Sequence, residues 1–364
     1  TNETCIYSTL HYIAGLSKKF NTLPVVTFDQ PLWWKAMLIV HAEDEGSYVK
    51  KTVLRLGGLH IEMSFLGAIG HLMTDTGLKE VLQTVFADTT VPHMLNGKAL
   101  SRAIRGHMLT ETALTALIVS MTFDIDIPRL CKEPESGQQA EDTEPTTVTS
   151  DTENIEANAH SDEIHINTER KLLENAMEVL DKLMSKTVDL DEAVKFKEVT
   201  HVVNSLETEI HSLKLYRTAK LWIQYMDMLD ILKQFIRAER IGDWKLHLHS
   251  ISLMLPYFAA CGRNAYTKSA TLYLHNMYNL HITHPQIYHS FSKGFHVVRR
   301  TNRYWAGLSS DLAIEQILMR SVKTVGGMTR GRGMDEAQRS LWILSRPVCS
   351  EINNQMQGLI RPKD

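Results

Sequence analysis

Four carboxylates are the residues of this chain whose types and positions could do chemistry: Asp29, Glu62, Asp311 and Glu315. Carboxylates at strand ends and helix starts, gathered from distant parts of a chain, can hold divalent metal ions, and a pair of such ions clamps the attacking and leaving oxygens of phosphoryl transfer. We therefore interpret Glu315, Asp29 and Glu62 as candidate catalytic residues. Glu315, Asp311 and Asp29 are the candidate Mg²⁺ ligands. The alternative left open is that each acid pairs with an arginine or caps a helix.

The case for Glu315 depends on a helix that we expect to begin at Ser309 or Ser310 and to run to about Lys323. Side chains placed at about 100° per residue put Glu315 in the middle of the apolar arc, with Asp311 one turn before it. Two acids on a buried face repel each other and lose hydration. They therefore need a cation, which a metal ion, an arginine or a bound substrate group could supply.

Residues 293–346 are strongly basic and carry aromatic side chains among the charges. That mixture can bind a phosphate backbone and stack on exposed bases. The candidate DNA-binding residues are Arg299, Arg300, Arg303, Arg320, Arg330 and Arg332. The alternative is that this basic segment associates with an acidic segment of the same chain.

A group of histidines lies close together in the sequence: His275, His281, His284, His289 and His296. The spacing of His281 and His284 can suit zinc, although Pro285 interrupts any helix there and no cysteine is nearby. A zinc metalloenzyme is therefore a third hypothesis, and histidines that face solvent or form hydrogen bonds are the alternative.

The elements that must position these residues begin as an alternation of strands and helices. We expect strands at 23–29 and 52–58, and helices at 33–42, 60–73, 77–87 and 97–120. This order is typical of a layered α/β unit. From about residue 168 the pattern is helical for a long distance, with Asp243 as an expected helix cap and Pro256 as an expected kink or helix end.

The composition changes at residues 132–167, which are acidic, rich in threonine and almost free of large apolar side chains. We predict a disordered linker there. The predicted organisation is an N-terminal α/β part at 1–131, this linker, a helical insertion at 168–290 and a basic part at 291–364 that completes the core.

The net charge of −3 argues against a general polyanion binder, and the four cysteines are scattered. Scattered cysteines favour reduced thiols in a nuclear or cytoplasmic protein. No apolar run is long enough to predict a membrane span. The chain begins with Thr1 rather than Met, which is typical of a fragment.

Most of the chain outside the acidic linker resembles a family of uncharacterised, mobile-element-like proteins that are abundant in invertebrate genomes. The segments that carry the resemblance are TFDQPLWWKA, LRLGGLHIEMSFLGAIGHLM, RTAKLWIQYMDMLDILKQFIRAERIGDW, MLPYFAACGRNAYTKSA and RYWAGLSSDLAIEQILMRSVKTVGGMTRGRGM. More distant relatives look like RNase H-like transposases, in which an acid precedes a histidine in a G-D-x-H-like turn and a later helix carries a glutamate. Here Gly58 takes the place of that acid before His60, and Glu315 matches the late glutamate.

The resemblance implies a predominantly helical α/β protein with an RNase H-like core that is interrupted by a large all-helical insertion. It also implies a transposon-derived DNA-binding protein, either an active or a degenerate Mg²⁺-dependent transposase or nuclease. DNA is the expected partner, no membrane is expected, and homo-oligomerisation is left open. The alternative function is that of a non-enzymatic helical module for protein–protein interaction.

Overall fold

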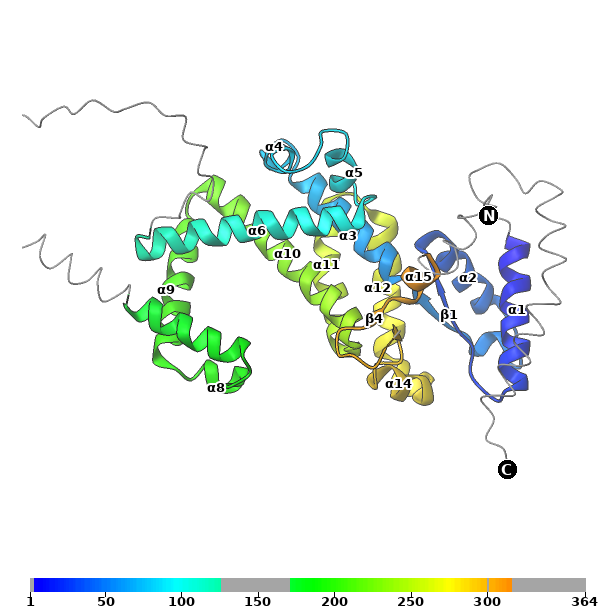
Figure 1. The fold of residues 1–364 in the computed structure, drawn as a ribbon. Helices are drawn as coiled ribbons and strands as arrows, with labels where there is room; N and C mark the ends of the chain where they lie inside the picture. Colours follow the sequence, from blue (N-terminus) through cyan, green and yellow to red (C-terminus); the bar gives the residue numbers. More distant parts are fainter. Residues whose placement is uncertain (1–2, 126–170, 300, 316–364) are drawn as a thin grey trace, which may run out of the picture. The chain divides into compact units, whose positions relative to one another are not determined.

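The computed structural model describes residues 3–125, 171–299 and 301–315 (Figure 1). These residues form two compact units. The first unit contains the described parts of 1–72, 94–98 and 231–364, and the second contains the described parts of 73–93 and 99–230. Residues 231–290, which the sequence analysis assigned to the helical insertion, fall in the first unit.

The elements of the first unit are mostly helices, with two pairs of short strands. In chain order they are α1 (Glu3–Lys19), β1 (Val25–Phe28), α2 (Gln30–Ala42), the 3₁₀ helix η1 (Val49–Lys51), β2 (Val53–Leu56), α3 (Gly58–Leu72), the end of α10 (Arg217–Ile241), α11 (Trp244–Ala260), α12 (Asn264–Tyr278), α13 (Leu280–Thr283), α14 (Pro285–Ser292), β3 (Val298–Arg299), β4 (Gly307–Leu308) and α15 (Ser310–Ala313).

The second unit is helical throughout its described residues. It contains α4 (Leu78–Gln83), α6 (Leu100–Phe123), a helix over residues 171–184, α8 (Leu190–Ala193), α9 (Lys197–Leu213) and the first part of α10. The short helix α5 (Val91–Leu95) crosses the boundary between the two sets of residues.

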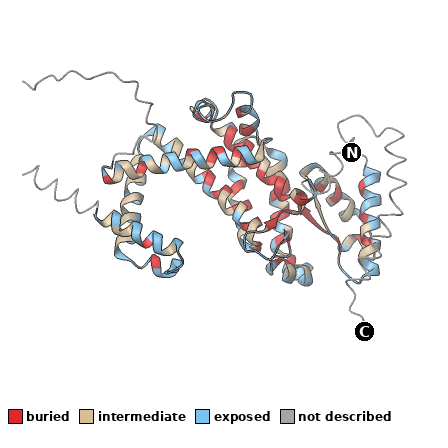
Figure 2. Ribbon diagram, viewed as in Figure 1, coloured by how far each residue is buried: buried red, intermediate tan, exposed pale blue. Residues whose placement is uncertain are grey.

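The centre of the first unit is a β–α–β arrangement. β1 and β2 are parallel and pair in register from Val25 with Val53 to Phe28 with Leu56. α2 connects them and packs on both strands. Every residue of β2 is buried, as Figure 2 shows for this strand and for most of α3. Strands that are covered on both faces are typically apolar, which accounts for Val53, Leu54 and Leu56, whereas Arg55 is a buried charged residue in the same strand.

The prediction that the chain is predominantly helical is confirmed for the described residues, which also contain a small parallel sheet. The remaining strands that the structure describes, β3 and β4, form a separate antiparallel pair. The described residues thus contain two small sheets and no larger sheet of the kind that an RNase H-like core would need.

Local sequence signals explain where several helices begin. Asp29 lies just beyond β1 rather than inside it, and its Oδ1 accepts a hydrogen bond from the Leu32 backbone N–H at 3.1 Å, which caps α2. Asp243 caps α11 in the same way, as predicted, with 3.0 Å between its Oδ1 and the nitrogen of Leu246. The expected helix end at Pro256 is wrong, because α11 continues through this residue to Ala260.

Replacing Asp243 with alanine is expected to lower the free energy of unfolding by about 1 kcal/mol, because the first turn of α11 loses a side-chain acceptor. Asp243→Asn keeps an acceptor oxygen and should cost only a few tenths of that amount. Urea unfolding of both variants measures the difference. Equal losses for the two substitutions would contradict the capping role.

Candidate functional site

The carboxyl ends of β1 and β2 bring together side chains that are far apart in the sequence. Asp29 directly follows β1, and His60 lies in the first turn of α3, just after β2. The two strands are parallel and in register, so their ends lie at one edge of the sheet. A third segment joins this edge, because the hydroxyls of Thr27 and Ser310 lie 2.8 Å apart and tie α15 to β1.

Asp311 of α15 lies at the N-terminus of α3. Its carboxylate accepts hydrogen bonds from the backbone N–H groups of Leu59 at 3.1 Å and His60 at 3.2 Å, and from that of Leu312 at 3.1 Å. The ring Nδ1 of His60 lies 3.0 Å from Oδ2. Burial alone would raise the pKa of Asp311, but the hydrogen bonds from His60 and Leu59 outweigh it and lower the pKa. A carboxylate at the positive end of a helix is in a favourable position.

His60 is the basic partner of this group. The hydrogen bond to Asp311 raises its pKa, burial opposes this shift, and the negative charges of Asp29 and Glu315 raise it further. Both acids are therefore close enough to act on the imidazole. Tyr266 donates a hydrogen bond from its hydroxyl to the backbone carbonyl of His60 at 3.2 Å, and this contact fixes the start of α3 against α12.

Gly57 and Gly58 leave room for two carboxylates. A Cβ atom on Gly57 would overlap the carboxylate of Asp311. A Cβ on Gly58 would lie 2.8 Å from the Cβ of Ser309 and 3.0 Å from Oε2 of Glu239. The Gly-Gly pair is thus required by close approach, and the position where the transposase pattern has an acid is lined by the carboxylate of Glu239 from α10.

Glu62 lies one turn further along α3 and is buried. Burial raises its pKa to about 8, with a further contribution from the negative charge of Glu239. It is therefore mostly protonated at neutral pH. A protonated carboxyl is a poor ligand for Mg²⁺, and the catalytic role expected for Glu62 stays a prediction.

The expectation that Glu315 lies on a buried face is wrong. Glu315 and the neighbouring Ile314 are exposed, and Asp311 is the buried acid of this segment. Ser309 occupies the N-cap position as predicted, although its side chain makes no capping hydrogen bond. The rest of the predicted helix lies outside the described residues.

The predicted DNA-binding arginines divide into two groups. Arg299 and Arg303 are exposed, and the guanidinium of Arg299 donates to the backbone carbonyls of Ile241 and Arg303. The others lie outside the described residues: Arg300, Arg320, Arg330 and Arg332. Aromatic side chains next to the first group are also exposed, with exposed fractions of 66% for Tyr304 and 52% for Trp305.

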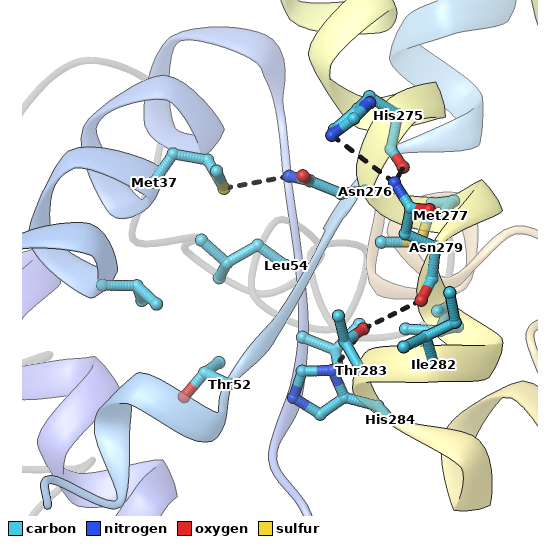
Figure 3. Close-up of a pocket in the computed structure, with 13 residues that line it drawn as sticks. Met37, Thr52, Leu54, His275, Asn276, Met277, Asn279, Ile282, Thr283 and His284 are labelled. Atoms are coloured by element: carbon cyan, nitrogen blue, oxygen red, sulfur yellow. Dashed lines mark hydrogen bonds between the residues drawn. The ribbon is translucent and has the colours of Figure 1, made fainter. Parts of the chain in front are cut away.

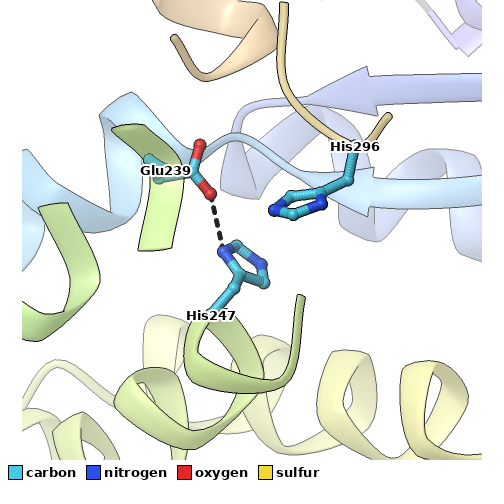
Figure 4. A group of neighbouring side chains, drawn as sticks. All are labelled: Glu239, His247 and His296. Carbon is cyan, nitrogen blue, oxygen red and sulfur yellow. Dashed lines mark ion pairs between the residues drawn. The ribbon is translucent and has the colours of Figure 1, made fainter. Parts of the chain in front are cut away.

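A second group of side chains could hold a metal ion. Glu239, His247 and His296 are all buried, and their candidate ligand atoms lie within 4.8 Å of one another (Figure 4). It is the one group of three such residues found in the part of the chain that the structure describes. The pair of histidines that the sequence analysis considered for zinc does not take part, because His281 is exposed and contacts the Tyr278 carbonyl while His284 contacts the Thr283 hydroxyl.

A cavity of about 390 Å³ lies beside the start of β2, with walls from α2, α12 and α13 (Figure 3). Its walls are mostly apolar, and Asn276 points from α12 toward the sulfur of Met37 at 3.9 Å. Thr52 to Leu54 line it, so it borders the beginning of β2 and not the end that leads to His60. The cavity contains none of the carboxylates discussed above.

Comparisons with known proteins identify a family but no activity. A family model described as a domain of unknown function, DUF8702, matches residues 1–362. The chain belongs to this family. No curated protein and no solved structure matches the chain. The resemblance to mobile-element proteins thus remains a prediction from the sequence segments quoted above.

Within the described residues, no helix combines the length and the apolar character that crossing a membrane requires.

The sequence alone did not indicate the contributions of Glu239, His247 and the α3 N-terminus. Glu239 and His247 lie on two successive helices, and their spacing in the sequence matches no recognised metal-binding motif. The one available signal was the Gly57-Gly58 pair, since adjacent glycines at the end of a strand indicate that another group approaches the backbone closely.

Proposed function

We propose that the chain is a DNA-binding protein derived from an RNase H-like mobile-element transposase, and that the edge formed by β1, β2 and α15 binds Mg²⁺ together with a DNA phosphate. The observation that carries the proposal is the convergence of Asp29, His60 and Asp311 at the ends of two parallel strands. Carboxylates gathered at strand ends from distant segments are the arrangement on which metal-dependent phosphoryl-transfer sites are built.

Asp29 and Glu315 are the carboxylates at this edge that fit Mg²⁺, which prefers oxygen ligands and retains several waters. Asp29 uses one oxygen as a helix cap, and Glu315 is exposed. Asp311 is already engaged by four N–H groups, and the raised pKa of Glu62 disfavours its ionised form, so Asp29 and Glu315 are the better candidates. A bound Mg²⁺ would neutralise phosphate charge and polarise a phosphoryl oxygen.

The protein's own contribution at this edge is positive charge and fixed geometry. The raised pKa of His60 keeps its imidazole protonated over a wider pH range than usual, so it offers a cation beside the carboxylates. Two candidate carboxylates, Asp29 and Glu315, are fewer than a two-ion cleavage site uses. We therefore propose Mg²⁺-assisted binding of DNA as the present function and strand cleavage as an ancestral one.

The exposed basic and aromatic residues before β4 suit a nucleic-acid backbone and its bases. Arg303 offers a guanidinium to phosphate, while Tyr304 and Trp305 offer rings on which unpaired bases can stack. Arg299 contributes less to such a surface, because its guanidinium is held by backbone carbonyls.

Fluorescence anisotropy with labelled single-stranded and double-stranded DNA tests the proposal. We expect binding that weakens steeply with added salt, since phosphate contacts release counterions. Trp305→Ala should weaken binding to single strands by about tenfold, because one stacked base contributes on the order of 1–3 kcal/mol. Lys79→Ala, at an exposed position on α4, is the matched control and should bind as the wild type does.

The metal dependence is tested with two conservative substitutions. Asp29→Asn keeps the helix cap, because asparagine caps as well as aspartate does, but it removes the charge that Mg²⁺ needs. We expect Asp29→Asn and Glu315→Gln to abolish the gain in affinity on adding Mg²⁺ while leaving Mg²⁺-free binding unchanged. Absence of any DNA retention at low salt would reject the proposal and favour the interaction module.

One observation supports that second candidate function, a non-enzymatic interaction module. Helical residues between 173 and 203 of the second unit line an apolar hollow of about 240 Å³, and several of its large apolar side chains are exposed, including Leu190 at 63% and Met177 at 59%. Exposed apolar groups beside a hollow are typical of protein-binding surfaces. DNA binding that fails while a partner protein is retained would favour this function.

A further inference from the structure

Three buried polar side chains lie close together in the interior of the first unit. Glu239 is close to the end of α10, His247 is in the first turn of α11, and His296 follows α14 (Figure 4). Their exposed fractions are 6%, 0% and 2%. The turn between α10 and α11 uses Gly242 with φ of +80°, and this tight connection is what brings Glu239 and His247 together.

The hydrogen bonds of the two histidines are made by the ring nitrogens that face away from the group. His296 Nδ1 lies 3.3 Å from the Phe291 carbonyl. A carbonyl only accepts, so Nδ1 carries the proton and Nε2 is an unprotonated acceptor. His247 Nε2 lies 3.2 Å from the hydroxyl of Tyr273, which can accept its proton in the same way. Histidines that bind metals have such a partner on the other nitrogen.

The atoms that face inward have no hydrogen-bond partner. They are both carboxylate oxygens of Glu239, Nδ1 of His247 and Nε2 of His296. Oε1 of Glu239 and Nδ1 of His247 are 2.7 Å apart without the angles of a hydrogen bond. Leaving a buried polar atom unpaired costs about 1–3 kcal/mol, so four such atoms at one place indicate that something else binds there.

We propose that Glu239, His247 and His296 bind one Zn²⁺ ion. Imidazole nitrogens and a carboxylate form a donor set that Zn²⁺ prefers, whereas Mg²⁺ prefers oxygen alone. Ligand atoms about 2.0 Å from one tetrahedral Zn²⁺ lie about 3.3 Å apart. The contact between Glu239 and His247 must therefore lengthen by roughly half an ångström, which a small rotation of the carboxylate provides.

Neighbouring groups hold the histidines in place. Arg55 is buried, donates a hydrogen bond to the backbone carbonyl of His296, and lies over the rings of Trp244 and Phe291. The hydrogen bond from Nδ1 of His296 to the Phe291 carbonyl also fixes the ring with Nε2 turned toward the group. None of the three ligands is exposed, and they leave one position of a tetrahedral Zn²⁺ for a water molecule or for the second oxygen of Glu239. An ion bound there stabilises the folded chain.

A direct proton shared between Glu239 and His247 is the rival explanation. It would satisfy one oxygen of Glu239 and Nδ1 of His247, but His296 Nε2 would remain unpaired in the interior. A cation contacts all three side chains at once. The two explanations differ in whether the chain takes up a metal ion, which can be measured directly.

The experiment uses the full chain after dialysis against a strong chelator, followed by addition of Zn²⁺ or of Co²⁺ as a coloured probe. Bound metal is counted by elemental analysis after removal of excess ion, and Co²⁺ reports tetrahedral coordination by its visible absorption. Glu239→Gln and His296→Gln remove one ligand each with little change in volume. Circular dichroism shows whether each variant is folded.

His107→Gln is the matched control. His107 is another histidine with 0% exposure, its Nδ1 lies 2.8 Å from the hydroxyl of Tyr225, and its Nε2 is also unpaired. Among the described residues, His107 does not belong to any group of three side chains that could hold a metal ion. We expect this variant to bind one Zn²⁺ per chain, as the wild type should, while the two ligand variants bind none.

Zinc should raise the melting temperature of the wild type by roughly 10 °C at a thousandfold excess over Kd, and should not raise that of folded Glu239→Gln. Failure of the wild type to take up Zn²⁺ or Co²⁺ would overturn the proposal. Uptake that is equal in the wild type and in the folded ligand variants would also overturn it, because surface histidines would then be the binding sites. Asp29→Asn should retain its Zn²⁺, which separates this site from the proposed Mg²⁺ site.

Discussion

Replacing Glu62 with glutamine is expected to stabilise the protein at pH 8 and to change its stability little at pH 4. Burial raises the pKa of Glu62 from 4.5 to about 8, so the folded chain resists the ionisation that the unfolded chain allows. An acid whose pKa is raised on folding makes the folded state progressively less stable as the pH rises above its unfolded value. Glutamine keeps the shape of the neutral acid and cannot ionise.

The size of the stabilisation expected for Glu62→Gln follows from the shift in the pKa of Glu62. A change from 4.5 to about 8 corresponds to on the order of 4 kcal/mol once the pH reaches 8, since each pKa unit is worth about 1.4 kcal/mol. Urea unfolding of the wild type and of Glu62→Gln at pH 4.5, 6 and 8, in the presence of a chelator, measures it. The difference in the free energy of unfolding between Glu62→Gln and the wild type should increase steadily from pH 4.5 to pH 8.

Glu207→Gln is the control for this series, because Glu207 is an exposed glutamate on α9. Its substitution should leave the free energy of unfolding within about 0.5 kcal/mol of the wild type at every pH. A Glu62→Gln variant that is less stable than the wild type at pH 8 would show that Glu62 is ionised and bound to a cation.

Zinc at Glu239 should reduce the difference in stability between Glu62→Gln and the wild type, because its positive charge offsets the negative charge that disfavours ionisation of Glu62.

The sequence predicted most of the local structure because the signals for it are local. The helix expected at 60–73 is observed as Gly58–Leu72, and the strand expected at 52–58 is observed as Val53–Leu56. Hydrophobic periodicity and the cap residue before α11 were sufficient for such assignments. The first helix, Glu3–Lys19, was not predicted, although its buried residues Ile6, Leu10 and Ala14 recur at helical spacing.

The site was predicted less well because it depends on long-range packing. The periodicity argument assumed that the apolar arc of the helix after Ser309 would face the core, and it therefore placed Glu315 inside. The structure instead turns Asp311 inward, since the N–H groups at the start of α3 and the imidazole of His60 satisfy a carboxylate there. The sequence of residues 309–323 does not indicate that hydrogen-bond donors from α3 lie beside Asp311.

Gly58 is a second position at which long-range packing could not be predicted from the sequence. Compared with the transposase pattern, Gly58 appeared to be the loss of an acid. In the structure the space beside it is filled by a carboxylate from another helix, that of Glu239, at 3.0 Å from where a Cβ would lie. A carboxyl group from a distant helix thus lines this position, and a comparison position by position along the sequence does not detect it.

Replacing Asp311 with alanine is expected to lower the free energy of unfolding by about 3 kcal/mol, because the buried N–H groups of α3 lose their acceptor and His60 loses its counterion. Asp311→Asn retains one acceptor oxygen and should cost less. Asp189→Ala is the control, since Asp189 is an exposed cap that accepts one hydrogen bond, from the Glu192 N–H at 2.8 Å. That substitution should cost about 1 kcal/mol.

The pH dependence of the Asp311 effect gives a sharper test. The lowered pKa of Asp311 contributes stability that is present above 3.8 and is lost as the pH falls through its folded value. The raised pKa of His60 contributes stability that is complete below 6.5 and is lost as the pH rises through its folded value. The wild type and Asp311→Asn should therefore differ most between about pH 4 and 6.5.

Nuclear magnetic resonance titration of His60 separates the electrostatic part of this interaction from packing. The pKa of His60 should fall in Asp311→Asn, because its largest source of positive shift is removed, and it should fall less in Asp29→Asn. A His60 pKa that is the same in the wild type and in folded Asp311→Asn would mean that the carboxylate does not pair with the imidazole in solution. The edge formed by β1, β2 and α15 would then lack the positive charge on which DNA phosphate binding is proposed to depend.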